Sequence, residues 1–338
     1  ICRLAIARGE KDLVGGIAGS VAARVIRIPN FQGGGPARWS GTVITQGSVS
    51  SEQAPYVIDE LKLPVPNRWR RNVRPAALAF FEDGRAVFST FEGDVWMLSG
   101  LDKELKRLRW KRFASGLGEP MGIAVRAGEV FVFSRAGITR LRDLNGDGEA
   151  DHHENFCDLM AQSGETREFP MDMKLRPDGG FYIAKGGIHS KGKAIQNGTI
   201  LSVSPHGRSV SQLAHGLREP FIGLDPVSGM VTASDQQGNE VPTTPIYPVR
   251  DGDYFGFHWA RHGGKQPARI AEPITWIPHI VDNSGASQIW IQGKRMGPLA
   301  GRLVHLSYGR PALFQVFMNE VDGQIEKPVI NLFDTPTS

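Results

Sequence analysis

Five prolines, spaced roughly 45 to 58 residues apart, open five similar stretches of this sequence. Each is followed by an alternation of apolar residues, a turn that contains glycine, and a second apolar run; they are Pro75, Pro120, Pro170, Pro220 and, in a looser version, Pro278. Apolar residues at every second position indicate strands with one buried face. A repeat of this length is typical of one four-stranded blade of a β-propeller. The sequence therefore predicts an all-β propeller over residues 54–338.

The turns inside the repeats fit tight hairpins. Asp83-Gly84, Asp178-Gly179 and Ser228-Gly229 place glycine, which accepts a positive φ at little cost, between two apolar runs. A β-sandwich whose strands have this spacing by coincidence is the alternative. Because an open ring exposes strand edges, we expect six blades, with the last one incomplete in this chain unless N-terminal strands complete it.

Residues 1–53 differ from the repeats. Two short apolar runs, Leu4–Ala7 and Val21–Ile28, are separated by glycine-rich joints. We interpret this part as a small N-terminal β module or as the remains of a preceding domain, with the propeller beginning near residue 54. The sequence starts at Ile1 without a methionine or a signal peptide, so we expect a mature or excised piece of a longer protein.

Charge and composition exclude several classes of function. The 39 basic and 35 acidic side chains are interspersed, and no basic run is interleaved with aromatic residues, so we expect no nucleic-acid partner. No apolar run approaches the length of a membrane span. The two cysteines, Cys2 and Cys157, form no zinc, haem or redox motif. Whether they pair with each other is left open.

The segment from Asp143 to Glu154 has the spacing of a calcium-binding loop. Oxygen-bearing side chains stand at loop positions 1, 3, 5, 9 and 12, with Gly148 at position 6, as in the pattern D-x-[DN]-x-[DN]-G-x5-E. Calcium takes about six to eight oxygen ligands, so a short loop must wrap the ion and turn sharply. The expected ligands are Asp143, Asn145, Asp147, the backbone carbonyl of Glu149, Asp151 and Glu154.

The flanks of this segment are typical of strands and not of helices. Val130–Phe133 and Gly137–Arg142 are rich in β-branched and aromatic residues and alternate in polarity. We therefore expect a structural Ca²⁺ site in a turn of a β-sheet, with a solvated acidic hairpin that holds no metal as the alternative. His152 and His153 fall at positions that do not ligate, and we expect them to face solvent.

Seven stretches spread over about residues 54–330 carry a resemblance to a known family. They are Asp94–Trp96, Arg112–Leu117, Ile138–Asp151, Gly216–Pro220, Ser234–Asn239, Trp276–Gly285 and Leu306–Gly309. Together they resemble the six-bladed propellers of the soluble glucose and sorbosone dehydrogenase type, which depend on pyrroloquinoline quinone. The nearest resemblance is to a subgroup found in large secreted bacterial proteins, often fused to a c-type haem domain.

The resemblance implies a secreted or periplasmic bacterial protein that oxidises a carbohydrate or small alcohol. It implies electron transfer through the quinone to a c-type haem domain or cytochrome partner, or to missing segments of the same protein. Glu168 matches the histidine that acts as the base, and Arg218 matches the arginine that contacts the quinone. Glu219 replaces the asparagine that usually follows, and no lysine near Leu306–Arg310 matches the one that binds the quinone carboxylates.

The repeat groups three of the candidate catalytic residues. Glu168 and Arg218 lie two residues before repeat prolines and His279 lies directly after one, so we expect all three at one end of the propeller channel. A carboxylate, a guanidinium and an imidazole there suit proton abstraction and charge stabilisation. Each has a simpler explanation: Arg218 paired with Glu219 or Glu168, and His279 bonded to a loop carbonyl.

Polar loops supply the candidates for cofactor binding. Besides Arg218 they are Asp235, Asn239, Asp282 and Asn283, which either rim the channel or cap loops and form turns. Two hypotheses of function follow. The first is a dehydrogenase; the second is a non-catalytic, calcium-stabilised propeller that acts as a binding or scaffold module in a larger extracellular assembly. Hydrolase or lyase action through Glu168 is a third, because a fold does not dictate chemistry.

Overall fold

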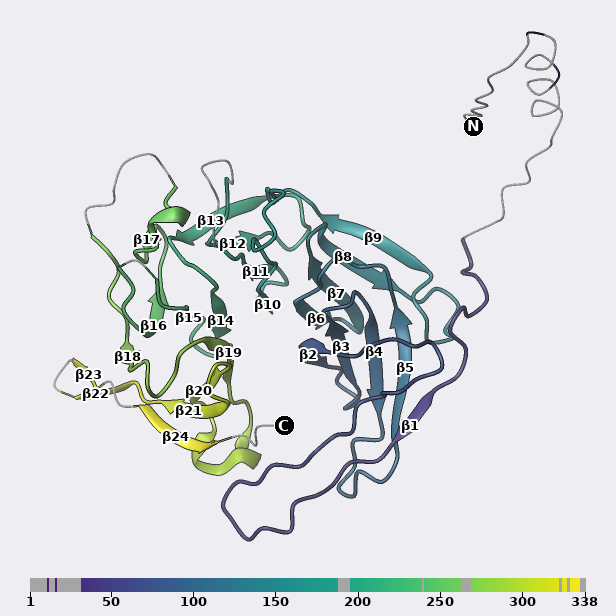
Figure 1. Cartoon of the computed structure of the whole chain (residues 1–338), viewed down its shortest axis with the longest axis horizontal. Coiled ribbons are helices and arrows are strands. Elements are labelled where there is room, and N and C mark those ends of the chain that lie inside the picture. The colour runs from purple at the N-terminus through teal and green to yellow at the C-terminus, as the bar shows by residue number, and fades with distance from the viewer. Residues whose placement is uncertain are drawn as a thin grey trace.

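The main strands form five sheets arranged around a central axis, as the blades of a propeller (Figure 1). The computed structural model describes residues 32–187, 195–238, 240–262, 269–321, 324–326 and 329–334, besides Lys11 and Gly16. In each blade the first strand is innermost and its successors follow outward in an antiparallel order. The predicted all-β propeller is therefore confirmed.

The strands of the five blades follow one another along the chain. Blade 1 contains β2 (Pro75–Phe80), β3 (Ala86–Thr90), β4 (Val95–Ser99) and β5 (Leu108–Ala114), with β1 (Val43–Thr45) at its outer edge. Blade 2 contains β6 (Gly122–Arg126), β7 (Glu129–Ser134), β8 (Gly137–Arg142) and β9 (His152–Cys157). Blade 3 contains β10 (Asp172–Leu175), β11 (Phe181–Ala184), β12 (Thr199–Val203) and β13 (Val210–His215), with β17 (Asp253–Tyr254) added in parallel.

The last two blades have the same plan. Blade 4 contains β14 (Phe221–Leu224), β15 (Val231–Ser234), β16 (Thr244–Val249) and β18 (Thr275–Ile277). Blade 5 contains β19 (Gly285–Trp290), β20 (Leu303–Ser307), β21 (Ala312–Val316) and β24 (Val329–Asp334). A hairpin of β22 (Asn319–Val321) and β23 (Gln324–Glu326) and two 3-10 helices, η1 (His258–Ala260) and η2 (Lys294–Leu299), complete the named elements.

The five prolines of the repeat mark the starts of the five blades. Pro75 is the first residue of β2, and Pro120, Pro170 and Pro220 precede β6, β10 and β14 by one or two residues. Pro278 instead follows β18 directly and lies in the turn that leads to β19, in line with the looser repeat there. A proline disfavours helical backbone in the residue before it, so it suits the beginning of an extended strand. The predicted hairpin turns are also confirmed, because Gly84, Gly179 and Gly229 have φ angles of 84°, 87° and 75°.

Apolar side chains fill the spaces between neighbouring blades. Val87 packs with Ile123 between blades 1 and 2, and Phe131 packs with Phe181 between blades 2 and 3. Similar clusters join blades 3 and 4 and blades 4 and 5. Fully burying one such side chain stabilises a fold by about 1.5–3 kcal/mol. These faces produce the alternation of apolar residues that the sequence shows.

The ring of blades is not closed. The innermost strands pack side by side in the order β2, β6, β10, β14 and β19, and no comparable packing joins β19 back to β2. In Figure 1 blades 1 and 5 stand on either side of this break. The described part of the chain thus forms five blades, and the expected sixth stays a prediction.

The end of the N-terminal segment joins blade 1. β1 pairs antiparallel with β5, where Val43 lies opposite Trp110. Val43, Leu63 and Trp69 pack on the apolar cluster of blade 1 that includes Trp96 and Trp110. Residues 43–74 therefore cover part of the face of blade 1 that lies opposite to the face packed against blade 2. The predicted strands at 4–7 and 21–28 lie outside the described residues.

Two further expectations concern the cysteines and membranes. Cys157, at the end of β9, is buried and free, while Cys2 lies outside the described residues. No helix in the described ranges is long and apolar enough to cross a membrane.

Candidate functional site

Glu168, at the position of the expected base, lies in the connection between β9 and β10 and is enclosed by protein. Its Oε1 lies 2.6 Å from Nζ of Lys185, and its Oε2 accepts hydrogen bonds from the hydroxyl and the N–H of Ser163. Lys185, directly after β11, also donates to the carbonyl of Ala161. Burial lowers the pKa of the Lys185 ammonium, and the bond to Glu168 opposes that effect.

The pair leaves Glu168 poorly placed to take a proton from a substrate. The exposed fractions of the Glu168 and Lys185 side chains are 1% and 0%. Two charges in such a site depend on each other, because removing either leaves the other buried and uncompensated. Glu168 thus holds the β9–β10 connection to the end of β11. Lys185 was not among the residues predicted from the sequence, although a lysine at the end of an apolar strand is a signal.

Arg218 and Asp235 lie together between blades 3 and 4. The Asp235 carboxylate accepts the N–H groups of Arg218 and Glu219, each at 2.8 Å, so it caps this turn. Burial raises the pKa of Asp235 to about 7, against the opposing effect of these N–H groups. The Arg218 guanidinium donates to the carbonyl of Gln237, and Glu219 pairs with Arg167. Arg218 thus bonds to a backbone carbonyl, and the alternative pairing with Glu168 or Glu219 is not formed in this structure.

The remaining candidates are dispersed. His279 is exposed in the turn after β18, whereas Asp282 is fully buried. The Asp282 carboxylate accepts hydrogen bonds from His305 Nε2 and the Ser307 hydroxyl, both at 2.7 Å. Burial raises the pKa of Asp282, but these two bonds outweigh it and hold the pKa below its ordinary value. Asn283 packs against Gly309, which has no room for a side chain.

No hydrogen bond or ion pair links Glu168, Arg218 and His279 to one another within the described residues. Their convergence on one pocket stays a prediction. Asn239 lies outside the described residues, so its expected role in cofactor binding also stays a prediction.

A cluster of charged and aromatic residues does gather where the innermost strands begin. We call it the entrance cluster; it consists of Arg74, Phe91, Glu92, Glu119, Arg135, Arg167, Phe169 and Glu219. Three ion pairs run through it: Arg74 with Glu92, Arg135 with Glu119, and Arg167 with Glu219. Several of these residues stand immediately before a repeat proline, a signal that the sequence contained.

Aromatic contacts connect the entrance cluster across three blades. The rings of Phe91 and Phe169 meet edge to face, with centroids 6.2 Å apart. The Arg74 guanidinium lies 5.1 Å from the Phe91 centroid, and the Arg135 guanidinium lies 5.4 Å from that of Phe169. Such cation–aromatic contacts add about 0.5–1 kcal/mol at exposed sites. The cluster is therefore an ordered polar surface with aromatic faces.

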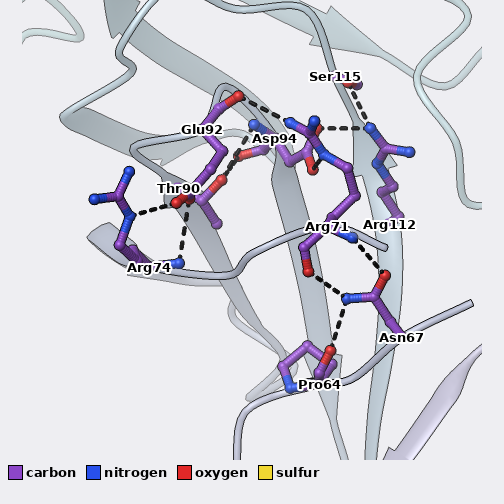
Figure 2. A network of polar contacts seen from close by, with 9 residues as sticks. All are labelled: Pro64, Asn67, Arg71, Arg74, Thr90, Glu92, Asp94, Arg112 and Ser115. Atoms are coloured by element: carbon purple, nitrogen blue, oxygen red, sulfur yellow. Dashed lines mark hydrogen bonds and ion pairs between the residues drawn. The ribbon is translucent and has the colours of Figure 1, made fainter. Parts of the chain in front are cut away.

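A polar network supports this surface from blade 1. Figure 2 shows Arg71 and Arg112 both reaching Asp94, with donor–acceptor distances of 2.8 Å for each. Arg71 also donates to the carbonyl of Glu92, whose side chain pairs with Arg74. Asp94 is fully buried, so it needs these two cations as partners. The network ties the covering segment 43–74 to the entrance cluster.

The predicted calcium loop forms the turn between β8 and β9. Asp143 accepts the N–H groups of Gly146 and Gly148, Asn145 accepts that of Asp147, and Asp147 accepts that of Glu149. Gly148, at loop position 6, has a φ of 82° as expected. The sharp turn is therefore confirmed, because side-chain acceptors and glycine stabilise it together.

The other expected ligands of this turn have protein partners. Asp151 accepts the N–H groups of Leu144 and Gly35. The side chain of Glu149 accepts those of Arg38 and Trp39, whereas the expected ligand at this position is its backbone carbonyl. Glu154 lies beside Arg140 and Arg142 instead of facing the turn. Among the described residues, no group of three or more acidic, histidine or cysteine side chains is arranged to hold a metal. His152 and His153 are exposed, as expected.

A cavity of about 750 Å³ occupies the centre of the propeller. Its walls come from β2, β6, β10, β14 and β19, with contributions from β3, β20 and β21. Asp172 and Lys174 are its only charged lining residues in the described part of the chain, and none of Glu168, Arg218 and His279 lines it. The sequence-predicted site residues thus lie outside the main cavity.

Comparisons with known proteins place the fold. No protein-family model matches the chain, and no curated protein matches it. An oxidoreductase (glucose dehydrogenase) from Thermus thermophilus is 18% identical over 78% of this chain and 85% of that one, with a TM-score of 0.58. The quinone-bound aldose sugar dehydrogenase of Streptomyces coelicolor is 15% identical over 77% of this chain and 82% of that one, with a TM-score of 0.56.

A third similar structure is a carbohydrate-active enzyme from Trichoderma reesei, solved as a calcium structure. It is 11% identical over 78% of this chain and 84% of that one, with a TM-score of 0.58. At these identities the likeness shows the fold. The chain has the β-propeller fold of soluble sugar dehydrogenases, as the resemblance in its sequence implied.

Proposed function

We propose that the chain is a dehydrogenase-like propeller that oxidises a sugar or another small alcohol. The observation that carries the proposal is the propeller fold shared with glucose and aldose sugar dehydrogenases over 77–78% of the chain. Because one fold hosts many chemistries, the choice of substrate rests on the surface that the blades present.

The entrance cluster is the substrate surface of this proposal. Loops at one end of a propeller channel supply its ligand sites. Carboxylates and guanidinium groups, such as those of Glu219 and Arg167, bond well to hydroxyl groups, and the faces of Phe91 and Phe169 suit the apolar face of a sugar ring. Their mutual contacts hold these groups in place before a ligand arrives.

The residues that the resemblance assigns to pyrroloquinoline quinone do not form a quinone site in this structure. Glu168 is enclosed with Lys185, Arg218 is directed at a backbone carbonyl, and Glu219 stands where the family has an asparagine. We assign no step to the quinone and no proton transfer to Glu168. A c-type haem domain or cytochrome partner and a secreted or periplasmic location belong to the proposal through the resemblance.

The second candidate function is a non-catalytic binding or scaffold module. The buried ion pair of Glu168 and Lys185 favours it, because the position of the family's base is occupied by a structural contact. The entrance cluster would then bind a carbohydrate without oxidising it.

A structural Ca²⁺ site at the β8–β9 turn belongs to both candidates. The observation that supports it is the sharp turn at Gly148, whose φ of 82° is the conformation that the calcium-loop spacing predicts. The oxygens of Asp143, Asn145 and Asp147 accept N–H groups in this turn and keep further lone pairs. Glu154, the expected ligand at the twelfth position, lies with Arg140 and Arg142.

The test combines binding and turnover. The purified chain, with Ca²⁺ and pyrroloquinoline quinone, is mixed with glucose or another aldose and an electron-accepting dye. A dehydrogenase reduces the dye only when sugar is present, and a parallel reaction without the quinone shows whether the reduction depends on it. Arg135→Gln in the entrance cluster should raise the KM for sugar by about tenfold, as expected for loss of a charged hydrogen bond.

The matched control is Arg85→Gln. Arg85 pairs with Asp83 in the exposed β2–β3 hairpin turn, so its loss should leave turnover unchanged. Sugar binding in calorimetry without any dye reduction would reject the dehydrogenase and support the binding module. If the chain neither binds nor oxidises a sugar, both candidates are rejected.

A further inference from the structure

Two ion pairs of the entrance cluster present their positive ends to solvent. The side chains of Arg74 and Arg167 are 67% and 49% exposed. Their partners, Glu92 and Glu219, are only 13% and 17% exposed. In the third pair of the cluster the two fractions are similar. Each pair is neutral as a whole, but a ligand that reaches this surface meets the guanidinium groups of Arg74 and Arg167 before the carboxylates behind them.

Most hydrogen-bond donors of Arg74 remain available to a ligand. A guanidinium carries five N–H donors. Within the described residues the Arg74 side chain donates only through Nε, to Glu92. Figure 2 shows its two Nη groups directed away from that carboxylate and from the rest of the network. Paired N–H donors of this kind match the two oxygens of a carboxylate. Arg74 can therefore bind a second carboxylate without releasing the first.

The position of Arg74 is fixed before a ligand arrives. Its backbone N–H donates to Glu92 Oε2, and its carbonyl accepts the N–H of Phe91. Its guanidinium also lies over the ring of Phe91. Because Glu92 and Phe91 already hold this arginine, a ligand would need to order little further.

The carboxylates of the cluster limit the negative charge that a ligand can bring. Glu92, Glu119 and Glu219 all belong to this surface. They would repel a phosphate, which has about −1.5 to −2 charges at pH 7, more strongly than a carboxylate with one charge. A single carboxylate is therefore the anionic group that suits the surface.

We propose that the sugar bound by the entrance cluster is a uronic acid, whose carboxylate accepts hydrogen bonds from the Nη groups of Arg74. This assignment names the substrate class of the proposed sugar surface and rests on that surface. Arg167 and Glu219 bond to hydroxyl groups of the sugar. The preference for an acidic sugar holds whether the chain oxidises its ligand or only binds it.

Three sugars that differ only at carbon 6 test the preference. Glucose carries a CH₂OH group there, glucuronate carries a carboxylate, and glucose 6-phosphate carries a phosphate ester. Calorimetry at low salt should show glucuronate bound about tenfold more tightly than glucose, as expected for added hydrogen bonds to a charged group. Glucose 6-phosphate should bind more weakly than glucuronate. In about 0.5 M NaCl the preference for glucuronate should shrink, because salt screens exposed charges.

A neutral double variant assigns the carboxylate to Arg74. Arg74→Gln combined with Glu92→Gln removes the guanidinium without leaving a carboxylate that has lost its partner. This variant should bind glucuronate and glucose equally. If it does not fold, the order of the three sugars and its salt dependence in the unaltered protein still decide.

Two further double variants separate the carboxylate from the hydroxyl groups. Arg167→Gln combined with Glu219→Gln should weaken glucose and glucuronate by the same factor. Arg85→Gln combined with Asp83→Asn removes an exposed pair in the β2–β3 turn and should keep the tenfold preference of the unaltered protein.

Equal affinities of the unaltered protein for glucose and glucuronate would overturn the acidic sugar and leave the proposed sugar surface in place. Binding of none of the three sugars would overturn both. Tighter binding of glucose 6-phosphate than of glucuronate would overturn the choice of a carboxylate. A preference for glucuronate that survives the loss of Arg74 and Glu92 would overturn the contact with Arg74.

Discussion

The Oε1 atom of Glu168 and the Nζ atom of Lys185 lie 2.6 Å apart in a site that excludes solvent from both side chains. The contact joins the end of β11 to the connection that leads into β10. The residue that matches the family's catalytic base is therefore part of the framework of blade 3.

Glu168→Gln should lower the free energy of unfolding by about 3–5 kcal/mol, because it leaves the Lys185 ammonium buried without a counter-ion. Glu168→Gln combined with Lys185→Met should recover part of the loss. Glu104→Gln, which breaks the exposed pair with Lys106, should cost less than about 1 kcal/mol. Urea unfolding measures all three, and a fully stable Glu168→Gln variant would contradict the role given to the pair.

Asp235 should make the protein less stable as pH rises from about 4 to about 7. Burial raises its pKa from 3.8 in the unfolded chain to about 7. In that window the folded state holds the extra proton, so the free energy of unfolding decreases with pH. Asp235→Asn should remove this contribution. The pH dependence of the free energy of unfolding is compared between the unaltered protein and Asp235→Asn. This comparison is needed because Asp282, whose pKa is lowered, contributes to the pH dependence of both proteins with the opposite sign. Identical pH profiles would disprove the assignment.

Calcium should raise the melting temperature, and a chelator should lower it. A ligand present at about 100 times its Kd stabilises the folded state by about 2.7 kcal/mol. Asp147→Ala should abolish the response to calcium, while Asp158→Ala, at an exposed position after β9, should keep it. An unchanged melting temperature after confirmed removal of the metal would count against a site in the β8–β9 turn.

Asp94→Asn should loosen the segment that covers blade 1. The change leaves Arg71 and Arg112 without their shared carboxylate, so we expect a loss of about 3 kcal/mol or more. Hydrogen exchange should increase in residues 64–74 more than in blades 3 and 4. Asp83→Asn, in an exposed pair with Arg85, is the control and should change neither quantity. Uniform exchange over all blades would show that the network acts only globally.

The fold could be predicted from the sequence because its signals are local. A proline near the start of an innermost strand and a glycine in a hairpin turn constrain the backbone within a few residues. The alternation of apolar and polar residues indicates which face of a strand is buried. These local signals do not set the number of blades, because that number depends on which distant sheet meets β2.

The candidate site was harder to predict because ion pairs depend on tertiary placement. Asp235 caps a turn, which was one of its two expected roles, but the N–H groups that it accepts belong to Arg218 and Glu219, 17 and 16 residues earlier in the chain. The partner of Glu168 comes from the end of another strand, and that of Glu219 comes from the preceding blade. The charged residues before the prolines were visible, but the sequence does not state which of them pair.

The β8–β9 turn also has a consequence for the order of events during synthesis. It holds the N–H groups of Gly35, Arg38 and Trp39 through Asp151 and Glu149, residues that follow them by 110–116 positions. At about 5–20 residues per second, a ribosome adds such a length in roughly 6–23 s. Residues 35–39 therefore lack these hydrogen-bond acceptors until blade 2 has left the ribosome.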